Sequence, residues 1–112
     1  ATFRARADVH FSENRYPVLF NDAGMTQFVI DTAHDLFGQD KVTEFDVPYM
    51  GAEDFAYYLQ KAPGAFICLG VNPNADAPYP PLHNPKYNFG DAPIPVAMRL
   101  MSNLALRFLE SN

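Results

Sequence analysis

His83 is the first residue whose type and setting could carry chemistry, since it lies in the segment Leu82-His83-Asn84-Pro85. An imidazole can bind a metal ion through a ring nitrogen or transfer a proton near neutral pH. Proline at position 85 stiffens the backbone that would present the ring. The alternative is a loop histidine hydrogen-bonded to a backbone carbonyl, and one histidine alone does not decide between the two. His83 is therefore a candidate for metal binding.

The adjacent carboxylates Glu53 and Asp54 form the second candidate, and they follow Gly51 and Ala52. Paired carboxylates can bind a cation or orient a ligand, and a glycine just before them lets a ligand approach the backbone closely. Acidic residues also stabilise the first turn of a helix through its dipole. Both interpretations of this pair stay open on residue type alone.

The other reactive side chains give no further site. Cys68 lies in an apolar run, where a free cysteine usually behaves as a small buried hydrophobe. His10 and His34 fall on faces that we expect to be solvated. G-x-S-x-G, C-x-x-C, H-E-x-x-H and glycine-rich phosphate loops are all absent from the sequence. We therefore assign no catalytic nucleophile or general base to the chain.

A proline-rich stretch over residues 71–95 must position His83. It holds seven of the ten prolines and shows no helical or strand periodicity. Ordered loops of this length are uncommon, and segments of this kind are usually functional or disordered. Because the stretch also carries Tyr79, Leu82, Tyr87 and Phe89, we predict an ordered loop laid across a surface and not a solvated linker.

The remaining elements alternate in an α/β arrangement. Strands are predicted over residues 2–11, 41–47 and 65–69, and helices over 22–37, 53–60 and from about 93 to the end. The first strand alternates apolar and polar residues but has no neighbouring strand close in the sequence, so part of its sheet is expected to be missing. Asp91 is the expected cap of the last helix. Its predicted inner face consists of Ile94, Ala97, Met98, Met101, Leu104, Ala105 and Phe108.

Composition excludes several classes of protein. The chain has 112 residues, 48% hydrophobic residues, a net charge of −5 and one cysteine. The acidic balance disfavours nucleic-acid binding, and no apolar stretch is long enough to span a bilayer. A single cysteine cannot form an internal disulfide, so a cytoplasmic location is expected. The first residue is alanine and not methionine, from which we expect processing or truncation.

Four segments in this order resemble one known family. They are Met50-Gly51-Ala52-Glu53-Asp54-Phe55, Pro63-Gly64-Ala65-Phe66, Leu69-Gly70 and Leu82-His83-Asn84-Pro85. Together they resemble the carboxy-terminal signature of the aminoacylase/carboxypeptidase family of two-metal hydrolases, in the branch that holds hippurate hydrolases and auxin-conjugate hydrolases. Arg15-Tyr16-Pro17 with Asn21-Asp22 also resembles the exit from the lid domain of that branch.

The resemblance implies a division of the chain and a role for each candidate. Residues 1–20 would be the last strand and exit of an α+β lid, often used for dimerisation, and residues 21–112 the carboxy-terminal part of an α/β catalytic domain. His83 would be the last metal ligand. Gly51, Ala52, Glu53 and Asp54 would line the substrate pocket. The metals would be divalent, such as zinc, manganese, cobalt or nickel.

The family's activity is hydrolysis of N-acyl amino acids or related small amides by metal-activated water. In that family the proton-accepting glutamate and the other metal ligands come from the amino-terminal remainder. We therefore expect this chain alone to be inactive, to hold no metal tightly, and to associate into homo-oligomers or exchange segments through its exposed edges. The alternatives are a stand-alone, non-catalytic binding module derived from that fold and a fold with no surviving function.

Overall fold

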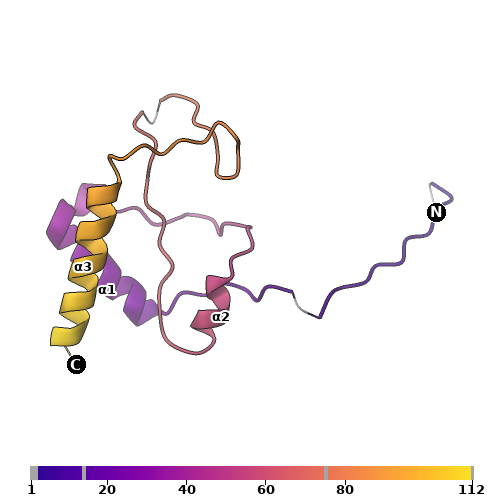
Figure 1. Cartoon of the computed structure of the whole chain (residues 1–112). Helices are drawn as coiled ribbons and strands as arrows, with labels where there is room; N and C mark the ends of the chain where they lie inside the picture. The colour runs from indigo at the N-terminus through magenta and orange to yellow at the C-terminus, as the bar shows by residue number, and fades with distance from the viewer. Residues whose placement is uncertain (1–2, 14, 75, 112) are drawn as a thin grey trace.

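The computed structural model describes residues 3–13, 15–74 and 76–111. Over these residues the chain forms α1 (Ala23–Phe37), the 3₁₀ turn η1 (Gln39–Lys41), α2 (Phe55–Leu59) and α3 (Ile94–Glu110). Figure 1 shows α1 and α3 side by side, α2 apart from them, and the amino-terminal segment extending away from the rest of the chain.

Helix α1 begins and ends where its sequence predicts. The Asp22 side chain accepts a hydrogen bond from the Met25 N–H at 2.9 Å, and the Thr26 hydroxyl donates to the Asp22 carbonyl at 2.7 Å. The first of these bonds satisfies a backbone N–H that the first turn of a helix leaves without a partner. At the other end the Gly38 N–H donates to the His34 carbonyl at 2.8 Å, and Gly38 has a φ of 95° that suits glycine.

Helix α3 starts differently from the prediction. Pro93 is its cap residue, and no side chain caps its first turn. Asp91 contributes its backbone carbonyl, which accepts from the Ile94 N–H at 3.1 Å, so the predicted side-chain cap at Asp91 is wrong. Pro95 occupies the first turn, where its missing N–H costs nothing.

The pairing of α1 with α3 makes the small core. Leu100 is buried, and the rings of Phe28 and Phe108 meet edge to face with centroids 6.4 Å apart. An Arg107 guanidinium nitrogen lies 2.8 Å from an Asp35 carboxylate oxygen. This ion pair is largely exposed, so apolar packing around Leu100 is the main contribution to the pairing.

Replacing Leu100 with alanine should therefore lower the free energy of unfolding of the 112-residue chain by about 2–3 kcal/mol, since it removes a buried side chain and leaves a cavity. Urea unfolding followed by circular dichroism measures the change. Leu106→Ala is the matched control, because Leu106 is 58% exposed on the same helix. Equal losses in the two variants would contradict the assignment of the core to Leu100.

The predicted inner face of α3 is wrong in part. Met98 and Met101 are 65% and 60% exposed, whereas Leu100, absent from the predicted face, is the buried residue. The helix carries apolar side chains on two sides, so periodicity alone could not decide which side meets α1. The side bearing Leu100 and Arg107 packs on α1; of the predicted face, Phe108 contacts Phe28, whereas Met98 and Met101 stay exposed.

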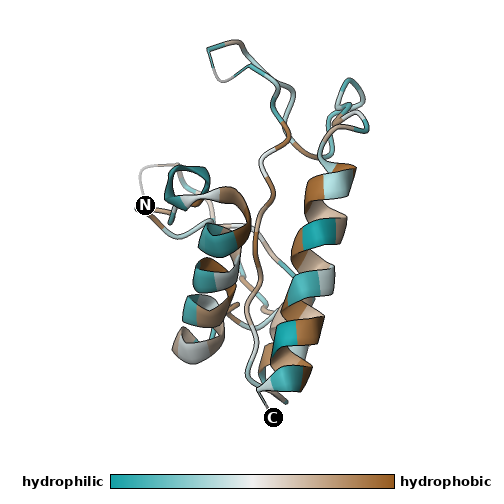
Figure 2. Ribbon diagram, turned by 90° about the vertical axis from the view of Figure 1, so that its left-hand side faces the viewer, coloured by the Kyte–Doolittle hydropathy of each residue, from teal (hydrophilic) through white to brown (hydrophobic). Residues whose placement is uncertain are grey.

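None of the three predicted strands is present among the described residues; Thr2 lies outside them. A strand needs a neighbour to share its backbone hydrogen bonds, and no described segment pairs with 3–11, 41–47 or 65–69 over more than one residue. The strands of the predicted α/β arrangement are therefore absent from the described residues, which are helical with extended segments. Figures 1 and 2 show one of these, the apolar segment around residues 65–70, passing alongside α1 and α3.

At one point a side chain takes the place of a neighbouring strand. The Asn21 amide nitrogen donates to the Phe66 carbonyl at 2.9 Å, and the Phe66 N–H donates to the Asn21 amide oxygen at 2.8 Å. The Asp22 N–H donates to the Gly64 carbonyl at 2.9 Å. These three bonds attach the segment after α2 to the start of α1.

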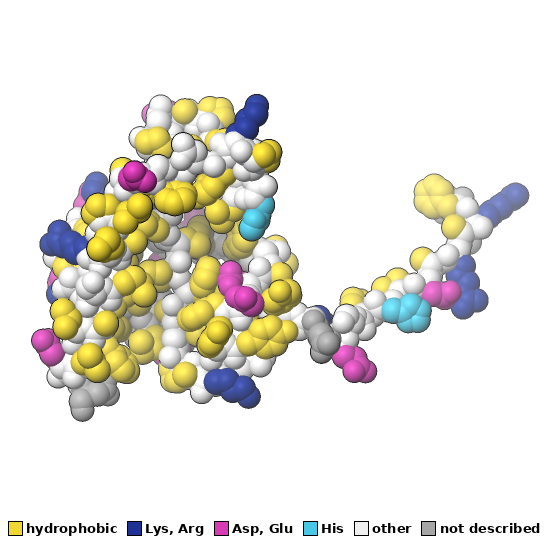
Figure 3. Space-filling view, viewed as in Figure 1, with side chains coloured by type: hydrophobic (Ala, Val, Ile, Leu, Met, Phe, Trp, Pro, Cys, Tyr) yellow, Lys and Arg dark blue, Asp and Glu magenta, His cyan; other side chains and the backbone are white. Residues whose placement is uncertain are grey.

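The chain leaves far more surface exposed than a compact protein of its size. Its accessible surface is 10071 Å², against about 6,200 Å² for a compact 12.5 kDa monomer. Its radius of gyration is 18.6 Å, against roughly 13 Å for 112 residues in a compact domain. Among the described residues the buried hydrophobic side chains are Ala33, Ala56 and Leu100. Figure 3 accordingly shows hydrophobic side chains spread over the visible face.

The structure gives no sign of a membrane span. Across the described parts of the chain, no helix is both long enough and apolar enough to cross a bilayer.

Candidate functional site

His83 lies at the third position of a tight turn. The Asn84 N–H donates to the Pro81 carbonyl at 3.2 Å, which closes a four-residue turn with His83 exposed. The φ of His83 is 68°, in the left-handed region that glycine prefers. A non-glycine residue there costs about 1–2 kcal/mol, and such strain is typical of functional sites. The sequence motif predicted the residue but gave no sign of this conformation.

The turn is fixed to the loop by the residue after His83. The Asn84 side-chain oxygen accepts from the Lys86 N–H at 2.9 Å, and the Asn84 carbonyl accepts from the Tyr87 N–H at 2.9 Å. Asparagine side chains often stabilise turns by binding a backbone N–H two residues on. Asn84 therefore holds the backbone on the carboxy-terminal side of His83.

An aromatic cluster supports the same loop. The ring centroids of Tyr79 and Tyr87 are 6.0 Å apart, and those of Tyr87 and Phe89 are 6.2 Å apart. The Tyr79 hydroxyl donates to the Asn88 carbonyl. Rings at these separations interact favourably. Three of the four large side chains predicted to order the loop thus contact one another, whereas Leu82 is exposed.

The Gly51–Asp54 segment lies just before α2 and not inside it, so the helix is shorter than the predicted 53–60. A Glu53 carboxylate oxygen accepts from the Phe55 N–H at 3.1 Å, which supports the interpretation of Glu53 as a helix-start residue. Asp54 is exposed, and its side chain makes no capping bond. Gly51 and Ala52 are exposed as well.

The described residues do not form a cluster of metal-binding side chains. No three of their histidine, cysteine, aspartate and glutamate side chains come close enough together to hold a metal ion. His83 offers one imidazole, whereas protein zinc sites use three or four protein ligands. Any metal bound at His83 therefore needs ligands from outside this part of the chain.

Cys68 departs from its predicted burial. Its side chain is exposed, because the extended segment that carries it has no sheet neighbour to cover it. It adds nothing to a site at His83.

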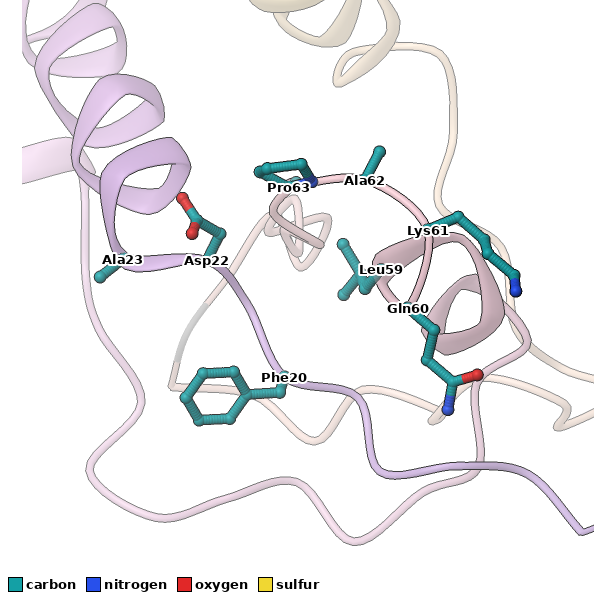
Figure 4. A pocket seen from close by; sticks show the side chains of 9 residues that line it. Phe20, Asp22, Ala23, Leu59, Gln60, Lys61, Ala62 and Pro63 are labelled. Atoms are coloured by element: carbon teal, nitrogen blue, oxygen red, sulfur yellow. The ribbon is translucent and has the colours of Figure 1, made fainter.

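The larger of two described hollows lies elsewhere. It has a volume of about 540 Å³ and lies between the start of α1 and the end of α2. Figure 4 shows Phe20, Asp22 and Leu59 around it, with Lys61 extending away from Phe20. The Asp22 carboxylate already caps α1. This hollow includes neither His83 nor residues 51–54, and sequence reasoning missed it because it depends on the contact between Asp22 and Gly64.

The second hollow, of about 420 Å³, lies where the proline-rich loop meets α3. Tyr79, Phe89 and Pro93 are among its lining residues, and His83 is not. It is a feature of the loop's base and not of the turn that carries His83.

Charge interactions perturb ionisation away from the candidate residues. A hydrogen bond and the charge of the neighbouring Lys41 ammonium, 2.8 Å away, hold the pKa of Asp40 below its ordinary value. The same contact raises the pKa of Lys41. Both side chains are exposed in η1, and neither is a candidate site residue.

Comparison with known proteins places the chain in a family. The sequence profile of peptidase family M20/M25/M40 matches residues 5–107. The chain therefore belongs to this peptidase family. The match includes His83 and residues 51–54.

Individual relatives have hydrolytic activities in their names. The chain is 31% identical to IAA-amino acid hydrolase ILR1-like 4 of Arabidopsis thaliana over 92% of this chain and 24% of that protein. It is 33% identical to N-acetyl-L-cysteine deacetylase of Bacillus subtilis, over 100% of this chain and 25% of that protein. It is 29% identical to thermostable carboxypeptidase 2 of Saccharolobus solfataricus, over 95% of this chain and 26% of that protein.

The chain thus spans about a quarter of the length of these relatives. No solved structure gives a significant match to it.

Proposed function

We propose that this chain is the carboxy-terminal part of a metal-dependent amidohydrolase that hydrolyses N-acyl amino acids or related small amides. The observation that carries the proposal is the family match over residues 5–107, which includes the turn that presents His83. The relatives named as IAA-amino acid hydrolase and N-acetyl-L-cysteine deacetylase support amide bonds to amino acids as the substrate class. We call the complete enzyme the parent protein.

The proposal divides the chain near residue 20. Residues 1–20 would belong to a lid or dimerisation domain, and residues 21–112 to the catalytic domain. In support, the amino-terminal segment extends away from the helices in Figure 1. Its contact with α2 is local: the Tyr57 hydroxyl donates to the Arg15 carbonyl at 3.2 Å, and the rings of Tyr16 and Tyr57 are 6.0 Å apart.

His83 would supply one metal ligand in the parent protein; among the proposed metals, which are zinc, manganese, cobalt and nickel, imidazole suits zinc and nickel best. A metal bound there would polarise the scissile carbonyl and activate water. Gly51, Ala52, Glu53 and Asp54 would line the substrate pocket, where the open Asp54 carboxylate and the exposed backbone of Gly51 can contact a substrate. No residue of this chain is proposed as general base.

A second candidate is a non-catalytic binding module. The observation that favours it is the incomplete metal site, because the described residues offer no cluster of three ligands. Such a module would bind an acylated amino acid or a protein partner without turning it over.

We expect the purified 112-residue chain to show no hydrolysis of acetyl-amino acids or hippurate with zinc, manganese, cobalt or nickel added. The parent protein should hydrolyse at least one of them, should lose about 1,000-fold or more of its rate on chelation, and should regain it with added metal. Turnover by the chain alone would contradict its proposed inactivity. A parent protein that never turns over these amides, but binds them in calorimetry, would favour the module.

A further inference from the structure

The amino-terminal segment is attached to α2 at Arg15 and Tyr16. The Tyr57 hydroxyl donates to the Arg15 carbonyl at 3.2 Å, and the ring centroids of Tyr16 and Tyr57 are 6.0 Å apart. Arg15 and Tyr57 are 42 positions apart in the sequence, so this is a tertiary contact. Pro17 restricts the backbone of Tyr16 to extended conformations, which limits the directions that its ring can take. Figure 1 shows the segment passing beside α2.

The same tyrosine is bonded to the residues that we propose to line the substrate pocket. The Tyr57 N–H donates to the carbonyl of Asp54, the last of those residues, at 3.0 Å. The backbone of Tyr57 thus holds Asp54 at the start of α2, while its side chain holds Arg15. Two hydrogen bonds through one residue therefore connect the amino-terminal segment with the end of segment 51–54.

A second attachment lies a few residues further along the chain, where the Asn21 side chain is bonded to the Phe66 backbone. Between the two attachments, residues 17–20 make no hydrogen bond within the described parts of the chain. Val18 and Phe20 are exposed, and Phe20 borders the hollow of about 540 Å³ (Figure 4). This short stretch can therefore bend while the residues on either side of it stay attached.

From these contacts we propose that Tyr57 is a positioning residue, which fixes the exit of the lid at Arg15 and so sets the place of the lid relative to residues 51–54. The inference rests on the proposed function for the role of the lid and of those residues. Movement of the lid is then confined to bending over residues 17–20. The Tyr57 hydroxyl proton is engaged by a backbone carbonyl, so Tyr57 is not a catalytic residue.

Trypsin cleavage of the 112-residue chain after Arg15 tests the attachment. The carbonyl of the bond to be cut is the one that accepts from Tyr57, and the protease must bind that same carbonyl in its oxyanion hole. Tyr57→Phe removes only the hydroxyl. It should raise the rate of this cleavage about 2- to 10-fold, which corresponds to the loss of one ordinary hydrogen bond.

Two controls separate this effect from general loosening of the chain. Cleavage after Arg6 is the internal control, because Arg6 lies in the same segment and its side chain bonds to Asp8. Tyr58→Phe is the matched variant, since Tyr58 is 69% exposed on the same helix and its hydroxyl makes no hydrogen bond within the described chain. Neither Arg6 cleavage in Tyr57→Phe nor Arg15 cleavage in Tyr58→Phe should change by more than about 1.5-fold.

Kinetics of the parent protein test the positioning role. Tyr57→Phe should raise KM for an acetyl-amino acid about 2- to 10-fold and leave kcat unchanged. The reason is that part of the binding free energy is then used to return the lid to its place, whereas the closed state is the same. Tyr58→Phe should change neither constant.

The possible failures are distinguishable. Unchanged cleavage after Arg15 in Tyr57→Phe, in the chain or in the parent protein, would overturn the inference. Unchanged KM in an active parent protein would overturn it as well, because the contact would then attach the segment without positioning the lid. A parent protein that hydrolyses no amide contradicts the proposed function instead, and cleavage after Arg15 in that protein then decides whether Tyr57 fixes the segment.

Discussion

Replacing His83 with glycine in the parent protein should lower kcat/KM by about 1,000-fold or more without lowering the stability of the fold. The two effects separate because His83 has a φ of 68°, which glycine adopts without steric cost. Glycine therefore relieves the backbone while removing the imidazole. A histidine that was only structural would show the opposite result, with activity retained or stability lost.

Steady-state kinetics, metal content by mass spectrometry and thermal unfolding of the same preparations measure these effects. His83→Asn is a second variant, since asparagine tolerates the left-handed region but does not replace an imidazole as a zinc ligand. It should also lose activity and metal. The control is His10→Ala, because His10 is exposed in the extended amino-terminal segment and should leave kcat/KM within a factor of two. Full metal content in His83→Gly would contradict the proposed ligand.

The sequence predicted those parts of the fold that depend on contacts between residues close together in the chain. Asp22 and Gly38 mark the ends of α1 because capping and the left-handed turn involve only residues within one helical turn. Helix α2 likewise ends at Leu59, one residue before the predicted end at 60. For such features the sequence carries the whole physical cause, and the structure confirms the predictions.

Contacts between distant residues account for the errors. The predicted strand over 65–69 has the right residue types, but within the described chain its hydrogen-bonded neighbour is the side chain of Asn21. The predicted inner face of α3 failed because α1 packs on the side of Leu100, and apolar residues occur on both sides. The pairing of a strand and the choice of which helix face packs both depend on the segment that lies opposite in space. The hydrophobic periodicity of one segment carries no information about that other segment.

The candidate site likewise combines features that the sequence predicted with features that it did not. Residue type and the neighbouring proline pointed to His83, yet its left-handed backbone follows from the closure of the turn between Pro81 and Asn84. For Glu53 the structure supports the helix-start alternative through its bond to the Phe55 N–H. The role proposed for residues 51–54 depends on groups outside the chain, and so does the metal site.

Mixing the 112-residue chain with the separately produced amino-terminal remainder of the parent protein should restore hydrolysis, at least about 1,000-fold above either part alone, because catalytic groups act only when assembled. The exposed surface provides the driving force, since it exceeds that of a compact monomer by about 3,900 Å². The extended segment 65–70 is the part best suited to join a sheet of the remainder. It is apolar, and beyond Phe66 its backbone makes no hydrogen bond within the described chain.

Leu69→Pro distinguishes sheet formation from looser association. The Leu69 N–H has no partner in the described chain, so proline there should change the helix content of the free chain little. In a sheet the same change removes a ladder hydrogen bond, and it should therefore abolish the restored hydrolysis. Leu69→Ile keeps the N–H and introduces a β-branched side chain, which favours strands, and it should complement as well as the original chain. If Leu69→Pro complemented fully, segment 65–70 would not enter the sheet as a strand interior, and the helices alone would mediate assembly.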